Sequence, residues 1–401
     1  MFPIVCSAIE SATRGDGVLK VTVTNSAASS VQIIYVLDVS YSMKQLSILK
    51  DETGKDVQHP FTNRDINLHG LLVSLKSMSE RDWACVITFG SGAPKLVVPW
   101  MRMDTAGKQT AEDMCRNPMD YLTATIFTSC IEKIGEQMML SPLHDGVNSA
   151  VIWYTDGEPS DNKPHSFFQE RIAFWKNKCM MENEISYDIY TLGIGQGVNS
   201  DLLTKLSTRF IHIYYTSHLA DFTRHLFASI YAKRYDALQI DVNSDATLIR
   251  DCMQGPWVEG VTRYIAYHGK LSSIQVNGIA VPLTISDLDS ENEIGKAHMM
   301  TKAYRAIRGG IPNQIVNAMN DPDIYPELYH DLDQVKLGLE NRTFKQNWGQ
   351  HFFKAFSQEL SFQVASSELN KCMQEFTSDA MKLVMDHSAD VFVIVRPPQP
   401  T

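Results

Sequence analysis

The sequence lacks the long apolar runs of membrane-spanning proteins and the paired cysteines of zinc-binding or disulfide-rich domains. No apolar run approaches the ~20 residues that a spanning helix needs, and no basic segment followed by an apolar stretch opens the chain, as in a signal peptide. The 7 cysteines are an odd number without a C-x-x-C pair, which argues against a disulfide framework or a zinc ribbon. We therefore expect a cytoplasmic protein with free, buried thiols.

A surplus of basic residues is also absent. The chain has 36 Lys and Arg against 46 Asp and Glu, for a formal net charge of -10. This balance does not favour binding to nucleic acid or to an anionic membrane surface, whereas a divalent cation or a basic partner suits it. The composition, with 44% apolar and 20% charged residues, is that of a globular protein, and 401 residues are enough for two or three domains.

Buried strands alternate with amphipathic helices from residue 31 to about residue 232. The run Val31 to Leu37 is almost continuously apolar, as expected of a strand that is buried on both faces of a parallel sheet. Further strands are predicted at 84–89, 95–98, 150–154, 189–194 and 210–215, and helices around 68–78, 127–138, 164–179 and 219–231. This alternation predicts a doubly wound, mostly parallel α/β domain of Rossmann-like type, with its ligand crevice at the carboxyl ends of the strands.

The pattern differs on both sides of this domain. Residues 237–285 read as short alternating strands, with Asn277-Gly278 as a type I′ hairpin turn, and 17–25 read as a half-buried strand. The region after residue 291 is helical, with one long apolar stripe through 369–384. We therefore divide the chain into N-terminal strands (1–30) that pair with an accessory β domain (236–290), the α/β domain (31–235), which is inserted between these two parts, and a C-terminal helical region (291–401).

Oxygen-bearing side chains occur at the ends of two predicted strands and at the start of a helix. Asp38, Ser40 and Ser42 follow the first buried strand, and side chains two residues apart point the same way in a chain that is still extended. Thr125 opens the helix at 127–138, and Asp156 follows the strand at 150–154. Because the carboxyl ends of parallel strands meet at one edge of the sheet, these three loops can converge there.

This ordered set resembles the metal-ion-dependent adhesion site of von Willebrand factor A domains, and the resemblance covers residues 31–232. The segments Ala84–Phe89, Leu192–Gly195 and Asp201–Leu203 resemble the family's second strand, its fifth strand and the start of the helix after it. The resemblance implies a Mg²⁺ ion, with Mn²⁺ or Ca²⁺ as alternatives, and a protein partner that presents an Asp or Glu to the ion. The ligands that it implies are Asp38, Ser40, Ser42, Thr125 and Asp156.

The residue types suit a hard cation. Magnesium prefers six oxygen ligands and readily keeps water among them. Three neutral hydroxyls fill coordination positions without cancelling the charge of the ion, which leaves it electrophilic toward a carboxylate from a partner. A second cation site is not predicted, because no pair of Asp residues follows Ser42.

The sequence departs from the family pattern at several positions. Tyr41 and Leu122-Thr123-Ala124 stand where many relatives carry glycine, and the added Cβ atoms could narrow access to the ion. Thr123 is a rival for the role of Thr125, although the register of the following helix favours Thr125. The segment 44–67 is longer than this fold requires, and it is either part of the partner surface or a plain solvated loop.

Motifs for enzymatic chemistry have little support. Gly193, Gly195 and Gly197 follow a strand, but Val198 stands where the third glycine of a dinucleotide motif would fall, and no nucleophile motif such as G-x-S-x-G occurs. We therefore predict a non-enzymatic protein-interaction or scaffold module. The alternative is a structural subunit of a large assembly, such as a virus particle, in which the metal site is incidental and the protein resides within that particle.

Overall fold

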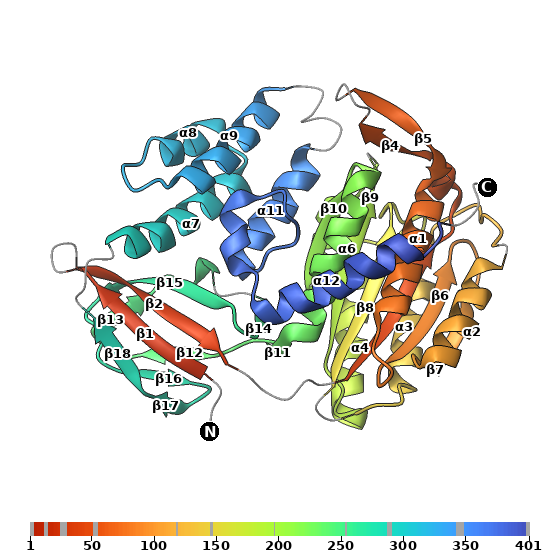
Figure 1. Ribbon diagram of the computed structural model, residues 1–401, viewed down its shortest axis with the longest axis horizontal. Helices are drawn as coiled ribbons and strands as arrows, with labels where there is room; N and C mark the ends of the chain where they lie inside the picture. The colour runs from red at the N-terminus through yellow and green to blue at the C-terminus, as the bar shows by residue number, and fades with distance from the viewer. Residues whose placement is uncertain are drawn as a thin grey trace. The chain divides into compact units, whose positions relative to one another are not determined.

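The chain forms two structural units, and each is described here by itself. The computed structural model describes residues 4–11, 15–24, 30–50, 55–117, 119–144, 147–195, 197–252, 255–286, 291–341 and 349–397. Unit 1 consists of Met1–Ala27 with Ala232–Leu383, and unit 2 consists of Ala28–Tyr231 with Val384–Thr401 (Figure 1). The chain therefore passes between the units at three places.

Unit 2 is built on a six-stranded sheet with the order β10-β9-β8-β3-β6-β7. Its five parallel strands are β3 (Val31–Asp38), β6 (Trp83–Phe89), β8 (Asn148–Thr155), β9 (Tyr187–Ile194) and β10 (Arg209–Ile213). The edge strand β7 (Lys95–Arg102) runs antiparallel to β6. Every residue of β3 is buried, as its apolar sequence predicts. The doubly wound, mostly parallel α/β fold class is confirmed.

Helices cover both faces of this sheet. They are α1 (Asn63–Ser77), α2 (Thr105–Arg116), α3 (Phe127–Met139), α4 (His165–Asn183), α5 (Ser200–Leu206) and α6 (Leu219–Ala232). On one face, leucines of α1 and apolar residues of α6 share a core with Ile33 and Tyr35 of β3. On the other face, the rings of Phe127 (α3) and Trp153 (β8) lie 4.8 Å apart, and Phe168 of α4 packs against Phe127. Both faces are thus closed, as a parallel sheet requires.

The long segment between β3 and α1 contains a β-hairpin. Its strands are β4 (Leu46–Lys50) and β5 (Asp56–Thr62), which pair antiparallel and stand beyond the end of the sheet at which α1 begins (Figure 1). A capping box formed by Thr62 and Asp65 then starts α1. Helix α1 therefore begins five residues before the first leucine of the predicted apolar stripe, Leu68.

Unit 1 contains a five-stranded sheet with the order β13-β15-β2-β1-β18. Its strands are β1 (Ile4–Glu10), β2 (Asp16–Val23), β13 (Ala246–Leu248), β15 (Thr262–Gly269) and β18 (Leu283–Ser286). The N-terminal strand β2 pairs antiparallel with β15, with Leu19 opposite Ile265. Two strands from the start of the chain therefore share a sheet with strands that follow unit 2 in the sequence.

The remaining strands of unit 1 form two small sheets. One contains β12 (Ile240–Val242), β16 (Ile274–Val276) and β17 (Ile279–Val281), and the other pairs β11 (Lys233–Tyr235) with β14 (Trp257–Val258). The turn between β16 and β17 has positive φ at both central residues, 50° at Asn277 and 77° at Gly278. These angles confirm the predicted type I′ turn.

The C-terminal region is helical, as predicted, with one correction. Its helices are α7 (Glu291–Gly309), α8 (Pro312–Met319), α9 (Pro326–Glu340), α11 (Gln350–Phe362), the 3-10 helix η5 (Lys371–Phe376) and α12 (Asp379–Ile394). The stripe through 369–384 is not one helix. It breaks between η5 and α12, where the Ser378 hydroxyl accepts a hydrogen bond of 3.3 Å from the backbone N–H of Met381 and caps α12.

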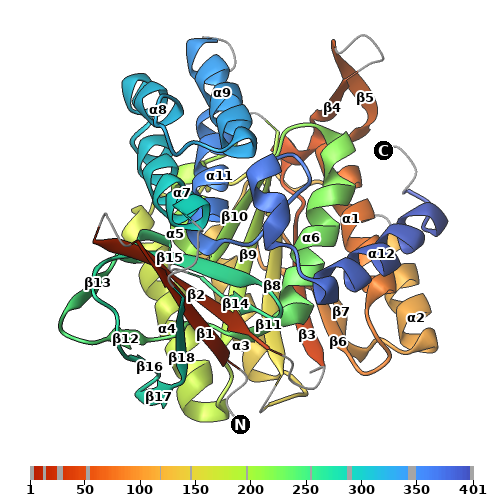
Figure 2. The same cartoon turned by 60° about the vertical axis from the view of Figure 1, so that its left-hand side comes forward.

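Residues 384–394 of α12 belong to unit 2, a division that the sequence pattern did not indicate. Figures 1 and 2 both show α12 alongside α1. Val395 is buried in the core that α1 and α6 share with the sheet, and Val391 and Phe392 pack against that core. The rings of Phe392 and His69 lie 5.3 Å apart. The last described turns of the chain therefore complete the surface of the α/β domain.

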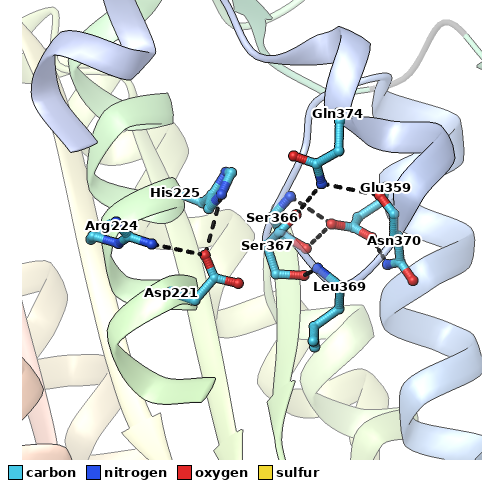
Figure 3. Close-up of polar contacts among 9 residues, drawn as sticks. All are labelled: Asp221, Arg224, His225, Glu359, Ser366, Ser367, Leu369, Asn370 and Gln374. Carbon is cyan, nitrogen blue, oxygen red and sulfur yellow. Dashed lines mark hydrogen bonds and ion pairs between the residues drawn. The ribbon is translucent and has the colours of Figure 1, made fainter. Parts of the chain in front are cut away.

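Within unit 1, Glu359 of α11 and Gln363, which follows α11, form buried hydrogen bonds to neighbouring segments. The buried Glu359 carboxylate accepts hydrogen bonds from the Ser366 backbone N–H at 2.5 Å, from the Ser366 hydroxyl and from the Asn370 amide (Figure 3). Gln363 is also buried, and its amide pairs with the backbone N–H and C=O of Tyr264 at 2.6 and 2.8 Å. The two bonds of Gln363 attach the helical region to strand β15.

None of the helices in the described part of the chain combines the length and apolarity that crossing a bilayer would require.

Candidate metal centre

The predicted ligands lie at the point where the order of strands in unit 2 changes direction. Strand β3 has β6 on one side and β8 on the other, so the connections after β3 and β8 leave the sheet in different directions. In open α/β sheets this point forms the ligand crevice. Asp38 is the last residue of β3, and Asp156 directly follows β8. Asp38 is fully buried, and Asp156 is 8% exposed.

Hydrogen bonds connect three of the five predicted ligands, Asp38, Ser40 and Ser42. The Asp38 carboxylate accepts from the Ser40 backbone N–H at 2.8 Å through Oδ1 and from the Thr155 hydroxyl at 2.6 Å through Oδ2. The Ser40 and Ser42 hydroxyl oxygens lie 3.0 Å apart, and the Ser42 hydroxyl acts to lower the pKa of Asp156. The loops after β3 and β8 therefore bring two carboxylates and two hydroxyls to one place.

Thr125 lies in a third loop that is fastened to the other two by its backbone. The N–H of Leu122 donates to the C=O of Val39 at 2.8 Å, and the Ser160 N–H donates to the C=O of Thr125 at 2.8 Å. The Thr125 N–H in turn donates to the Ser160 hydroxyl at 3.1 Å. Thr125 is buried, whereas Thr123 is exposed. These bonds fasten the loop that carries Thr125 to the loops after β3 and β8.

Asp161, in the loop that follows Asp156, supports the third loop from outside. Its carboxylate accepts hydrogen bonds from the backbone N–H groups of Phe127 and Thr128, at 3.1 and 2.7 Å, and from the Thr128 hydroxyl at 2.6 Å. It therefore caps α3 from a distance of more than 30 residues in sequence. Sequence patterns indicated neither Asp161 nor Thr155, because their partners lie on other segments of the chain.

The two buried carboxylates, Asp38 and Asp156, have raised pKa values. Burial, together with repulsion by Asp156, raises the pKa of Asp38 to about 7, although hydrogen bonds from Ser40 and Thr155 act in the opposite direction. Burial also raises the pKa of Asp156. The Oδ1 atom of Asp156 is buried and has no hydrogen-bond partner among the described residues. The repulsion between two desolvated carboxylates is relieved either by a proton on one of them or by a bound cation.

A divalent cation fits these residues. It would neutralise the repulsion between Asp38 and Asp156 and would give the Asp156 Oδ1 atom a partner. The hydroxyls of Ser40, Ser42 and Thr125 would then supply neutral oxygen ligands of the kind that Mg²⁺ accepts.

The departures from the family pattern are accommodated locally. The Tyr41 side chain is 64% exposed, which places it at the surface and not in the interior of the site. Leu122 packs against Gly90, and a Cβ atom on Gly90 would lie 2.6 Å from the Leu122 Cβ. Because Gly90 has no side chain, the larger Leu122 side chain fits at this position. Gly157 adopts a φ of +78°, and a Cβ atom there would lie 2.7 Å from the Leu203 Cδ1.

Comparisons with known proteins bear on the fold. The profile of the family described as VWA / Hh protein intein-like matches residues 321–390. A von Willebrand factor type A structure from Catenulispora acidiphila is similar with a TM-score of 0.56 and 14% identity, over 91% of this chain and 96% of that chain. The ArnB paralog VWA2 from Sulfolobus acidocaldarius is similar with a TM-score of 0.54 and 12% identity, over 89% and 98%. A search of curated proteins finds no match.

The α/β domain of this chain is therefore a von Willebrand factor A domain in its fold. Because both alignments cover about nine-tenths of the chain, the similarity extends beyond this domain into the β and helical parts.

Proposed function

We propose that this protein is a non-enzymatic interaction module that binds an acidic side chain of a partner protein through Mg²⁺. Asp38, Ser40, Ser42, Thr125 and Asp156 would hold the ion, directly or through water. Mn²⁺ or Ca²⁺ could take the same place. A carboxylate of an Asp or Glu from the partner would complete the coordination.

The observation that carries this proposal is the pair of buried carboxylates at the strand switch point. Asp38 has a pKa of about 7, and Asp156 has a buried oxygen without a hydrogen-bond partner in the described part of the chain. Such an arrangement is costly for the folded protein unless a cation offsets it. Since three of the five ligands are uncharged, the protein contributes only two negative charges to the site, and the ion remains a Lewis acid that can accept an incoming carboxylate.

Metal binding by purified variants tests the first half of the proposal. We expect the wild-type protein to bind one Mn²⁺ ion per chain at this site in an EPR titration and Mg²⁺ to compete for it. Asp156→Ala should abolish this binding. Asp113→Ala removes an exposed carboxylate on α2 and serves as the matched control that leaves the binding unchanged. Equal Mn²⁺ affinity of Asp156→Ala and wild type would contradict the proposal.

Partner capture tests the second half. Proteins that the wild type retains in Mg²⁺ should be released by EDTA and should not be retained by Asp156→Ala. Association that persists in EDTA would instead favour the alternative of a structural subunit with an incidental metal site.

A further inference from the structure

Two exposed side chains stand at the edge of the proposed metal centre without being ligands. Tyr41 lies between Ser40 and Ser42 in the sequence and is 64% exposed. Lys44 follows two residues later and is also exposed. Both belong to the 3-10 helix η1 (Tyr41–Lys44), so the segment that presents the ligands also presents a phenol ring and an ammonium group to the solvent.

The ammonium group of Lys44 has no carboxylate partner among the described residues. Its Nζ atom lies 5.8 Å from the ring centroid of Tyr41 and 6.0 Å from that of Tyr121. Cation–π contacts at exposed sites are weak, and no described residue accepts a hydrogen bond from the ammonium group. In contrast, Lys76 of the same unit is ion-paired at 2.6 Å with Glu112.

Tyr121, against which Lys44 lies, is held firmly. The Arg64 guanidinium carbon is 3.8 Å from the centroid of its ring, and the Tyr121 hydroxyl oxygen is 3.0 Å from that of Thr62. Arg64 is itself buried and donates to the C=O of Met119 at 2.6 Å. The aromatic surface beneath Lys44 is therefore in place before any partner binds, which lowers the entropic cost of binding.

We infer that Tyr41 and Lys44 form a second recognition subsite, which selects partners with two neighbouring acidic residues. This inference rests on the proposed function: one carboxylate of the partner binds the ion, and the adjacent one pairs with Lys44. Tyr41 provides an apolar surface for the backbone and methylene groups between the two acids. A positive charge two residues from a metal ligand disfavours the bound cation, and a second anionic group of the partner offsets this effect.

A peptide library tests the subsite without knowledge of the natural partner. The probe is a set of heptapeptides with a fixed central Asp and random flanking residues, bound to the full-length protein in Mg²⁺ and eluted with EDTA. We expect Asp and Glu to be enriched next to the fixed Asp. Lys44→Glu should replace this preference by one for Lys and Arg. Lys44→Ala should weaken binding of the selected diacidic peptide about 2–5-fold, as loss of an exposed ion pair does.

A lysine in a comparable setting serves as the control. Lys178 lies 5.2 Å from the ring centroid of Trp175 on α4, and Lys178→Glu makes the same change of charge there without altering the selected sequences. The same peptide preference for wild type and Lys44→Glu would overturn the subsite, while elution by EDTA would still support the proposed function. If EDTA elutes no peptide from the wild type, the proposed function and the subsite are both overturned.

Discussion

Asp38 links the stability of the protein to pH and to metal. Its pKa in the folded protein is about 7, raised from 3.8, so its ionisation opposes folding. A carboxyl group with a raised pKa contributes stability that is present below pH 3.8 and is lost as the pH rises through about 7. This dependence is opposite in sign to that of a carboxylate in a favourable ion pair.

We therefore predict that the increase in the free energy of unfolding on adding metal depends on pH. In EDTA, the free energy of unfolding of the wild type relative to Asp38→Asn should fall between pH 4.5 and pH 7.5, and urea denaturation measures it. Saturating Mg²⁺ should remove most of this fall for the wild type and change Asp38→Asn little. Parallel curves for the two proteins in EDTA would be inconsistent with a buried, repelled carboxylate.

Gly157 is needed for both its backbone angle and its lack of a side chain. Gly157→Ala should destabilise the protein by about 1–3 kcal/mol for the positive φ and by a further ~1–3 kcal/mol for the contact with Leu203. Gly92 has a φ of +92°, and no atom lies within 4 Å of the place that a Cβ atom would take, so Gly92→Ala should show the first loss alone. Urea denaturation of both variants separates the two effects, and equal losses would argue against the Leu203 contact.

At the scale of elements, Asp161 joins the start of α3 to the loop after β8. Asp161→Ala removes three hydrogen bonds from residues 127 and 128. We expect a loss of about 1–2 kcal/mol in stability and, because Thr125 directly precedes this region, a weaker Mn²⁺ affinity.

The cap of another helix provides the control for this prediction. Asp104 caps α2 by accepting from the Gly107 N–H at 2.9 Å, and α2 does not carry a predicted ligand. Asp104→Ala should cost about as much stability and leave Mn²⁺ affinity unchanged. If both variants lose the same affinity, the effect of Asp161 is general destabilisation and not positioning of the Thr125 loop.

Local sequence patterns predicted elements and site residues to different degrees. The alternation of buried strands with amphipathic helices was sufficient to predict the central sheet. Asp38 and Asp156 lie at strand ends, as their order along the chain predicted, and their role as metal ligands stays a prediction. The hairpin β4–β5 was missed, although Val57, His59 and Phe61 alternate with exposed residues in β5, as a strand pattern does.

Other features depend on contacts that no local pattern contains. The bond from Thr155 to Asp38 spans 117 residues, and the fit of Leu122 against Gly90 appears only when two loops meet. Helix α2 was not predicted, because it buries only Gly107, Ala111 and Cys115, which is a weak apolar stripe. The break before α12 depends on the helix cap at Ser378. It could not be predicted, because Ser378 stands within a segment whose apolar residues otherwise follow helical spacing.

At the scale of the whole molecule, unit 2 is not a continuous piece of the chain. A fragment of residues 28–231 lacks the segment that contributes Val395 to the core. Joining residues 384–397 to this fragment through a flexible linker should raise its free energy of unfolding by roughly 1.5–3 kcal/mol, the value of burying one such side chain. Urea denaturation compares the two, and a joined segment carrying Val395→Asp is the control. No difference among the three would show that the fragment does not use this segment.

The division of unit 1 into two pieces also has a consequence during synthesis. The hydroxyls of Thr22 and Thr262, on the paired strands β2 and β15, lie 2.7 Å apart but are separated by 240 residues. A ribosome that adds ~5–20 residues per second takes roughly 10–50 s to make that stretch. Until β15 emerges, β1 and β2 can form only a two-stranded hairpin, which is marginal in water. All strands of the α/β sheet precede β15 in the sequence. The nascent chain can therefore complete that sheet first, while the β1–β2 hairpin still lacks the strand that pairs with β2.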